Sequence, residues 1–327
     1  MRIASLLPAA TEWIAAFGAG PDLVARSHEC DHPPAAQELP VITKATYAQK
    51  DDARAIHDAV SSQLEAGLSL YDVDLERLAA LAPDVVCTQA QCDVCAVTLA
   101  DVEADLRTHV PGATLFSMQP DTMKAVLDAA LRLGHTLGRA DAAMQYIARK
   151  EQQLRRLHAS IGLERCTDPA TLPSVVCIEW TDPLMVAGHW TPDVVAHGGG
   201  HALLTDAGDA SRRMAWDELA AADPDALFVM PCGFTMTDTA RNWEALTGHP
   251  TWNTLRAVQA GRVFCFDGNA YFNRPGPRLY RAAELVAQAL YPDNAAGAPA
   301  APWELQRGRP VPEHADLDPP AQGSMAN

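Results

Sequence analysis

Short apolar runs alternate with helical patterns along the first 120 residues of the chain. The apolar runs predict strands over residues 2–6, 23–26, 85–88 and 114–117. Helical patterns lie over residues 9–17, 52–66 and 73–81, and in 52–66 the apolar positions recur three and four residues apart. Strands that alternate with helices are typical of a parallel sheet covered on both faces.

Residues 121–162 break this rhythm. Two helical patterns run from 121 to 134 and from 141 to 161, and Gly134 and Gly138 mark the break between them. At about 1.5 Å per residue, the second helix would be about 30 Å long. A helix of that length between two strand-rich halves suggests a rigid connector.

The alternation returns in residues 163–292. We expect strands over 174–178, 226–230 and 263–266, and helices over 192–196, 216–221, 239–246 and 277–290. After Pro292 the chain is rich in Ala and Pro, so 293–327 is predicted to be a mostly disordered tail or a loose wrap. The predicted fold class is α/β, with an N-terminal lobe at 1–120, connecting helices at 121–162, a C-terminal lobe at 163–292 and a tail.

Composition and charge narrow the functional classes. Hydrophobic residues make up 48% and charged residues 20% of the 327 residues, which fits two folded domains, each with its own core. The formal net charge of −16, without a basic stripe, argues against nucleic acid as a partner. No run approaches the roughly 18 apolar residues of a membrane span, so membrane insertion is not expected.

The N-terminus bears on the compartment. Pro8, Thr11 and Glu12 interrupt the first apolar stretch, and no secretory signal pattern is visible. We therefore expect a cytoplasmic protein, or a periplasmic one if the true start lies upstream. In a reducing compartment the cysteines stay free, and Cys87, Cys177 and Cys265, which lie inside apolar runs, are expected in the core.

The chemically rich segments all follow predicted strands. They are residues 7–12, 27–33, 89–95, 179–192, 231–234 and 267–278. In open α/β sheets, ligands bind outside the carboxyl ends of the strands. If two such lobes face each other, these segments line one cleft that holds a single sizeable ligand.

Several of these segments carry a family resemblance. They are Ser5-Leu6-Leu7-Pro8-Ala9-Ala10-Thr11-Glu12, Ser27–Asp31, Gln91–Ala96, Gly188-His189-Trp190, Pro231–Phe234 and Asn269–Arg278. Together these segments resemble the cobalamin-binding relatives of class III periplasmic binding proteins, and the resemblance spans roughly residues 1–292. It implies two Rossmann-like lobes with central parallel sheets joined by one long rigid helix. It also implies a metal-chelate ligand, such as a corrinoid, haem or ferric siderophore, that is passed to an ATP-driven transporter with its permease. The chain is expected to depart from exported members, because no signal peptide is visible and its loops are rich in Cys and His.

Aromatic, imidazole and amide side chains supply the predicted ligand site. Flat macrocycles are held by aromatic walls, and imidazole is the usual axial ligand of cobalt or iron. Amide groups of the first helix N-terminus can face an anionic edge of the ligand. The predicted ligand-binding residues are Pro8, Thr11, His28, Glu29, Cys30, Gln91, Glu179, Trp180, His189, Trp190, Cys232, Phe234, Tyr271, Phe272, Asn273 and Arg274.

A separate metal site is an open alternative. Cys92 and Cys95 have the spacing of a zinc chelate or of a dithiol redox pair, or are half-buried cysteines near a helix start. In an extended loop His28 and Cys30 would share a side with His32, and with Cys92 and Cys95 nearby they would make a site suited to zinc, ferrous iron or cobalt. The predicted metal ligands are His28, Cys30, Cys92, Cys95 and the imidazole of His189. The alternative without a metal or ligand is that residues 28–32 form a polar loop before Pro33.

Three functions follow from these residues. The first is binding of cobalamin or another corrinoid as the substrate-binding component for ABC-type uptake or intracellular trafficking. The second is a zinc- or iron-dependent enzyme or metal-trafficking protein, although no Ser-His-Asp or HExxH arrangement points to a reaction or to any catalytic residue. The third is binding of a ferric siderophore, which would use Arg26, Arg274 and Arg278 against an otherwise acidic chain.

Overall fold

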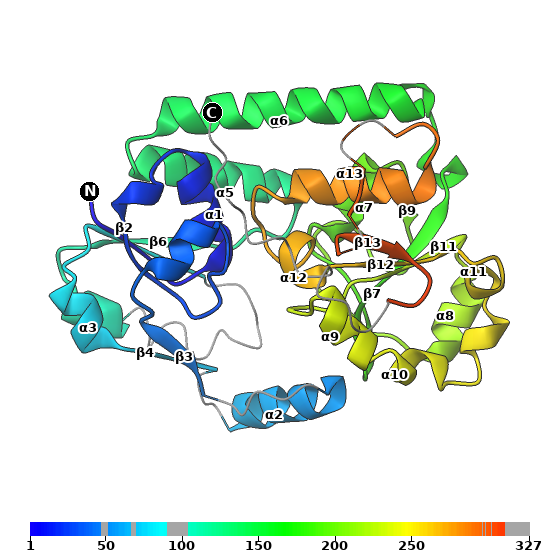
Figure 1. The fold of residues 1–327 in the computed structure, drawn as a ribbon, viewed down its shortest axis with the longest axis horizontal. Coiled ribbons are helices and arrows are strands. Elements are labelled where there is room, and N and C mark those ends of the chain that lie inside the picture. The colour runs from blue at the N-terminus through cyan, green and yellow to red at the C-terminus, as the bar shows by residue number, and fades with distance from the viewer. Residues whose placement is uncertain are drawn as a thin grey trace. The chain divides into compact units, whose positions relative to one another are not determined.

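The structure is a computed structural model that describes residues 1–46, 52–66, 70–89, 104–295, 297, 299–301 and 303–310. The chain divides into two compact units. Unit 1 is Met1–Lys50, Ala55–Pro120 and Lys124–Ala148, and unit 2 is Asp51–Arg54, Asp121–Met123 and Arg149–Asn327. The long helix α6 (Ala140–Ile161) begins in unit 1 and ends in unit 2 (Figure 1).

Unit 1 is built on a parallel sheet in the order β2-β1-β5-β6. A short antiparallel pair, β3 with β4, forms a second sheet. The strands are β1 (Ile3–Ser5), β2 (Leu23–Arg26), β3 (Thr43–Ala45), β4 (Tyr71–Val73), β5 (Val85–Gln89) and β6 (Thr114–Met118). The helices are α1 (Pro8–Ala16), α2 (Ala53–Glu65), whose first two residues fall in unit 2, α3 (Leu75–Ala80), a helical segment at 104–109, and α5 (Met123–Thr136).

Each face of the unit 1 sheet has its own core. Ala4 of β1 and Val86 of β5 are fully buried in a cluster with Leu78 of α3. In α1, the Trp13 ring stacks on Phe17 at 5.5 Å and meets the edge of Tyr146 of α6 at 5.9 Å. The alternation of strand side chains between the two faces therefore places apolar groups on both, as the sequence pattern predicts.

Unit 2 contains a mixed sheet in the order β10-β8-β7-β11-β12-β13, with β9 beside β7. Its centre, β7-β11-β12, is parallel, whereas β8, β10 and β13 pair antiparallel with their neighbours. The strands are β7 (Ser174–Thr181), β8 (Leu184–Val186), β9 (His201–Ala202), β10 (Arg212–Arg213), β11 (Ala226–Val229), β12 (Val263–Phe266) and β13 (Leu305–Arg307).

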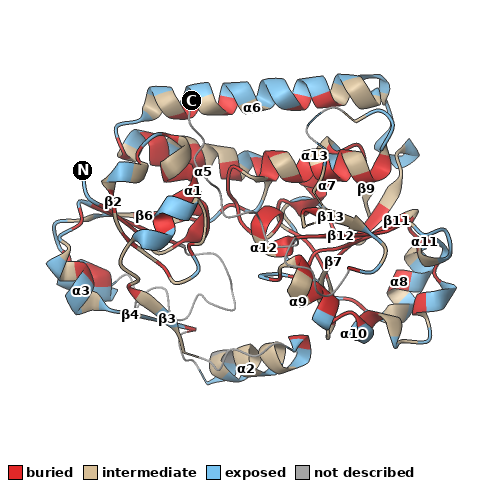
Figure 2. Ribbon diagram, viewed as in Figure 1, coloured by how far each residue is buried: buried red, intermediate tan, exposed pale blue. Residues whose placement is uncertain are grey.

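Helices cover both faces of this sheet. They are α7 (Thr191–His197), α8 (Trp216–Ala222), α9 (Met236–Arg241), α10 (Glu244–Thr247), α11 (Arg256–Gln259), α12 (Gly268–Tyr271) and α13 (Leu279–Leu290). Val176 and Ile178 of β7 pack in one cluster with Leu219 of α8 and Leu246 of α10. On the other face α7 and α13 approach so closely at Gly198 that a Cβ there would collide with Val286. Figure 2 shows the central strands and most of α13 as buried.

The structure corrects three sequence-based expectations. Residues 73–81 hold the end of β4 and the helix α3, not one helix. Residues 239–246 hold parts of α9 and α10, because Thr235 and Asp238 form a capping box that starts α9 earlier and Asn242 Nδ2 donates to the Asp238 carbonyl oxygen at 3.0 Å where α9 ends. The predicted tail contributes β13, which pairs with β12 through Phe264–Arg307 and Phe266–Leu305.

Candidate functional site

Three segments meet at the carboxyl edge of the unit 2 sheet. They are the end of β7 with Glu179 and Trp180, the β11 loop (Pro231–Phe234) and the β12 loop (Asp267–Arg274). The Cys232 amide donates to the Glu179 carbonyl oxygen at 2.9 Å, and the Asn269 amide donates to the Phe234 carbonyl oxygen at 3.1 Å. Backbone hydrogen bonds thus bring together six predicted site residues that lie far apart along the chain: Glu179, Trp180, Cys232, Phe234, Asn273 and Arg274.

Two glycines let these loops approach each other. A Cβ on Gly268 would collide with the Pro231 carbonyl oxygen, so only glycine permits the β12 loop to lie against the β11 loop. Gly233 has a φ of +72°, a left-handed conformation that favours glycine and turns the chain after Cys232. The exposed Cys232 thiol is therefore presented on a tight turn.

Trp180 supplies an aromatic face at this edge. Its ring lies 5.0 Å from the Phe234 ring at 54°, and its Nε1 donates to the Asp182 carbonyl oxygen at 3.0 Å. Phe234 is buried, whereas Trp180 is partly exposed. A ring fixed by one hydrogen bond and one ring contact can present its remaining surface to a flat ligand.

The loop after β8, Gly188–Trp190, holds an imidazole and an indole. His189 has a φ of +52°, and its amide donates to the Asp209 carbonyl oxygen at 2.6 Å. Trp190 is buried and its Nε1 donates to the Phe272 carbonyl oxygen at 2.7 Å, so this loop is tied to the β12 loop.

The His189 ring is uncharged at neutral pH. Burial lowers its pKa below 6.5, and the opposing attraction of Asp121 does not reverse this. Its Nδ1 is buried and makes no hydrogen bond within the described part of the chain. A neutral imidazole held half-buried in a strained backbone conformation is chemically suited to act as a ligand of a metal.

Within the β12 loop the side chains divide into two groups. Tyr271 and Phe272 are 5% and 1% exposed, and Phe272 packs on Phe266 at 5.0 Å, so both rings face the interior of unit 2. Arg274 donates from Nη2 to Asn269 Oδ1 at 2.7 Å. Asn273 Oδ1 is buried and accepts no hydrogen bond in the described residues. The loop therefore continues, after its two buried rings, with the polar side chains of the partly exposed Asn273 and the buried Arg274.

The predicted ligand-binding residues of unit 1 form two separate groups. Pro8 opens α1, and the Thr11 hydroxyl lies 2.8 Å from Ser5 Oγ and 3.1 Å from Cys30 Sγ. Thr11 and Cys30 are fully buried, so their side chains contact each other and not the surface.

His28 belongs to the other group. Its Nδ1 lies 2.6 Å from Thr43 Oγ1 and its ring centroid 5.5 Å from that of Tyr71, whose hydroxyl donates to Glu29 Oε1 at 3.2 Å. The loop turns at residues 28–29, because the Cys30 amide donates to the Ser27 carbonyl oxygen. The expectation of an extended loop with His28 and Cys30 on one side is therefore wrong.

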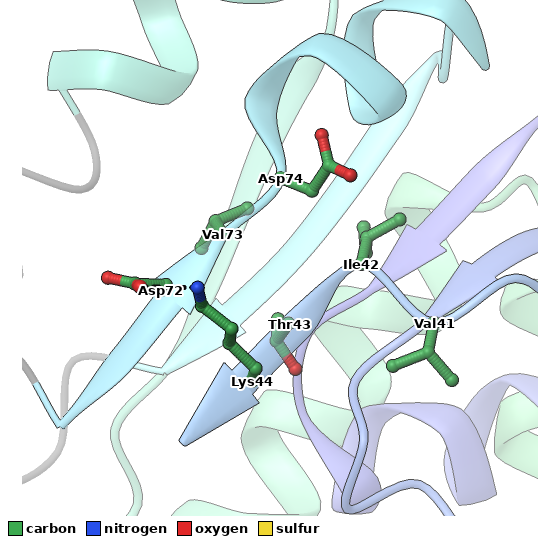
Figure 3. Close-up of a pocket in the computed structure, with 7 residues that line it drawn as sticks. All are labelled: Val41, Ile42, Thr43, Lys44, Asp72, Val73 and Asp74. Carbon is green, nitrogen blue, oxygen red and sulfur yellow. Dashed lines mark ion pairs between the residues drawn. The ribbon is translucent and has the colours of Figure 1, made fainter. Parts of the chain in front are cut away.

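A shallow hollow of about 450 Å³ lies beside His28 on the β3–β4 pair. Its lining includes Thr43, which bonds His28, and Lys44, which forms an ion pair with Asp72 at 3.2 Å (Figure 3). The hollow thus carries both charges of one ion pair and a hydroxyl.

The predicted metal site is partly outside the described residues, since Cys92 and Cys95 lie there, as does the predicted ligand-binding residue Gln91. Among the residues that are described, no three His, Cys, Asp or Glu side chains are grouped to hold a metal ion. Cys87, Cys177 and Cys265 are core residues as expected, and burial raises the pKa of Cys87 to about 12. None of the described helices has the length and apolar character needed to cross a membrane.

A family model described as "Periplasmic binding protein" matches residues 3–270, well over half of the chain. The chain belongs to the periplasmic binding protein family. One relative in this family is the vitamin B12-binding protein of Vibrio cholerae serotype O1, which is 24% identical over 293 residues and 88% of either chain.

Solved periplasmic binding proteins share the fold. A periplasmic heme binding protein from Pseudomonas aeruginosa matches with a TM-score of 0.67 at 21% identity, over 96% of this chain and 99% of that one. An ABC transporter substrate-binding protein from Listeria monocytogenes EGD-e matches with a TM-score of 0.64 at 16% identity, over 89% and 99%. The predicted α/β fold, with parallel sheets in two lobes joined by a long helix, is confirmed.

Proposed function

We propose that the chain binds cobalamin or another corrinoid and serves as the substrate-binding component of an ABC-type uptake or trafficking system. The observation that carries the proposal is the relationship to a vitamin B12-binding protein over 88% of both chains. The partner would be an ABC transporter permease, because the fold is that of substrate-binding proteins.

The carboxyl edge of unit 2 supports this ligand class. Trp180 presents a partly exposed ring, His189 offers a neutral imidazole, and Asn273 has an amide oxygen free of hydrogen bonds within the described residues. A corrinoid combines a broad, flat ring with amide side chains around it, so aromatic faces and amide partners suit it. A metal-centred macrocycle also supplies a metal ion that an imidazole can bind.

Direct titration tests the proposal. Purified protein is titrated with cyanocobalamin and with aquocobalamin by calorimetry and by visible absorbance, and hemin is titrated in parallel. We expect saturable 1:1 heat with corrinoids and an absorbance change with aquocobalamin, whose water ligand an imidazole can replace. The absence of heat and of spectral change with both corrinoids would contradict the proposal, and saturable binding of hemin alone would reassign the ligand to haem.

The compartment stays a prediction. The cytoplasm is proposed here, with the periplasm as the alternative. Osmotic-shock fractionation of cells that express the chain from its native gene would find it in the shocked cells, and its release with the periplasmic fraction would refute this.

A further inference from the structure

The segment Trp303–Gly308, here called the C-terminal latch, lies against the β12 loop outside the residues that the family model matches. It contains β13, which extends the unit 2 sheet beyond β12. At the C-terminal end of the latch, the Gly308 amide donates to the Val263 carbonyl oxygen at 2.7 Å. The other end of the latch carries Glu304, a carboxylate residue only 8% exposed.

Glu304 joins three parts of unit 2. Its carboxylate accepts hydrogen bonds from Arg281 of α13, Nε at 3.1 Å and Nη2 at 2.9 Å. It also accepts from the Tyr271 hydroxyl of the β12 loop at 2.9 Å and from the Ala301 amide at 2.9 Å. A buried carboxylate with four donors is held in one position, and so are the groups that donate to it.

The C-terminal latch also contacts both ends of α12. The Asp267 amide, just before α12, donates to the Glu304 carbonyl oxygen at 3.3 Å. At the other end, the Tyr271 ring stacks on Trp303 at 6.0 Å and lies 5.7 Å from the Arg278 guanidinium. Tyr271 is thus fixed by its hydroxyl and by its ring.

We propose that Glu304 is a positioning residue that sets the conformation of the β12 loop through Tyr271. Asn273 and Arg274 follow Tyr271 by two and three residues, so fixing Tyr271 inside unit 2 constrains where these two polar side chains lie. The ligand part of this inference rests on the proposed corrinoid function, whereas the effect on the loop does not. The C-terminal segment is then part of the site and not an accessory tail.

The first test is Glu304→Gln with amide hydrogen exchange read by mass spectrometry. Glutamine keeps the size of the side chain but removes the charge that pairs with Arg281. We expect exchange in peptides covering 268–274 to rise about tenfold, and the affinity for cyanocobalamin to fall about tenfold, since hydrogen bonds to charged groups are among the stronger ones. Unchanged exchange and affinity would overturn the proposal.

Asp225→Asn is the matched control. Asp225 accepts hydrogen bonds from Ser174 and Arg256, but it lies at the amino ends of β7 and β11, the opposite edge of the same sheet. We expect Asp225→Asn to lower the free energy of unfolding. Amide exchange in 268–274 should not rise selectively, and the affinity for cyanocobalamin should be kept. If both variants speed exchange equally across unit 2, Glu304 is merely structural and the proposal fails.

Tyr271→Phe is the second variant and serves if Glu304→Gln does not fold. It removes one hydroxyl and leaves the ring on Trp303. We expect a smaller rise in exchange in the same peptides, a result that a purely global role would not give, and the proposal fails if no rise is seen there. If wild-type protein binds no corrinoid, the proposed function fails while the exchange experiment still decides the role of Glu304.

Discussion

Two partly buried tryptophans of unit 2 differ in what surrounds them. Trp180 lies over Phe234 at the carboxyl edge of the sheet, whereas Trp216 stacks on His249 at 4.2 Å in the helical layer. We expect Trp180→Ala to weaken cyanocobalamin binding at least about tenfold, because aromatic anchors carry much of the energy at ligand and protein contacts. Calorimetric titration of the variant measures the loss.

Trp216→Ala is the control for this prediction. It removes a ring of the same size, also partly exposed, from a different environment, so urea unfolding should show lower stability while the affinity of the folded protein is kept. Equal affinity losses in both variants would mean that Trp180 acts through stability alone. An unchanged affinity of Trp180→Ala for cyanocobalamin would show that Trp180 is not part of the ligand site.

The sequence identifies the segments of the candidate site better than the direction of each side chain. The rule that ligands meet the carboxyl ends of strands selects the ends of β7, β11 and β12, and hydrogen bonds join these segments. Tyr271 and Phe272 were expected to stack on a ligand, but Tyr271 bonds Glu304 and Phe272 packs on Phe266. Their inward direction depends on residues 266 and 304, which local patterns do not connect.

At the scale of elements, well-buried strands and long helices are predictable, and short strands with little buried surface are not. The strands over 23–26 and 263–266 and the helix ending at Ile161 agree with the sequence pattern, because β12 is buried at every position, β2 is buried at alternate positions and the helix is long. The strands β3 and β4 have three residues each and little buried surface, and β13 needs a partner about forty residues away. Their formation depends on tertiary pairing that a local window does not contain.

The contact between α6 and α7 contains a titratable pair. His158 of α6 and His197 of α7 stack with centroids 5.5 Å apart, and His197 Nδ1 lies 3.4 Å from His158 Nε2. Burial lowers the pKa of both rings below the ordinary 6.5 and is the largest cause for each. The charge of His158 lowers the pKa of His197 further, and Asp193 opposes this shift. For His158, the hydrogen bond with His197 and the charge of Glu164 oppose the lowering without reversing it. The folded state therefore favours neutral rings at this contact.

We expect the free energy of unfolding to fall as the pH drops below about 6.5. A histidine whose pKa is lowered by folding takes up protons more readily in the unfolded state, so its stabilisation is present above 6.5 and is lost on acidification. Urea unfolding of wild type and of a His158→Gln, His197→Gln double variant between pH 7.5 and 5.5 measures this. The double variant should show the smaller pH dependence.

His135→Gln, at an exposed position of α5 in unit 1, tests whether the loss of any histidine has this effect. It should retain the wild-type pH dependence. Identical pH dependence in the wild type and the double variant would show that the stacked pair does not titrate in this range.

At the scale of the whole molecule, charge separates two ligand classes. The net charge of −16 repels anionic ligands over a distance set by salt, about 30 Å at 0.01 M and about 3 Å at 1 M. Cyanocobalamin carries almost no net charge, whereas many ferric chelates are anions. The same protein surface therefore treats the two ligand classes differently as the ionic strength changes.

We expect an anionic ferric chelate to compete poorly with cyanocobalamin at low salt and to compete better as salt screens the repulsion. The affinity for cyanocobalamin itself should change little over the same series, which makes it the internal control. Competition titrations from about 0.01 M to about 1 M salt measure both. If the chelate displaces cyanocobalamin best at low salt, local positive charge at Arg274 and Arg278 outweighs the net charge of the chain, and the ligand class shifts from corrinoids to ferric siderophores.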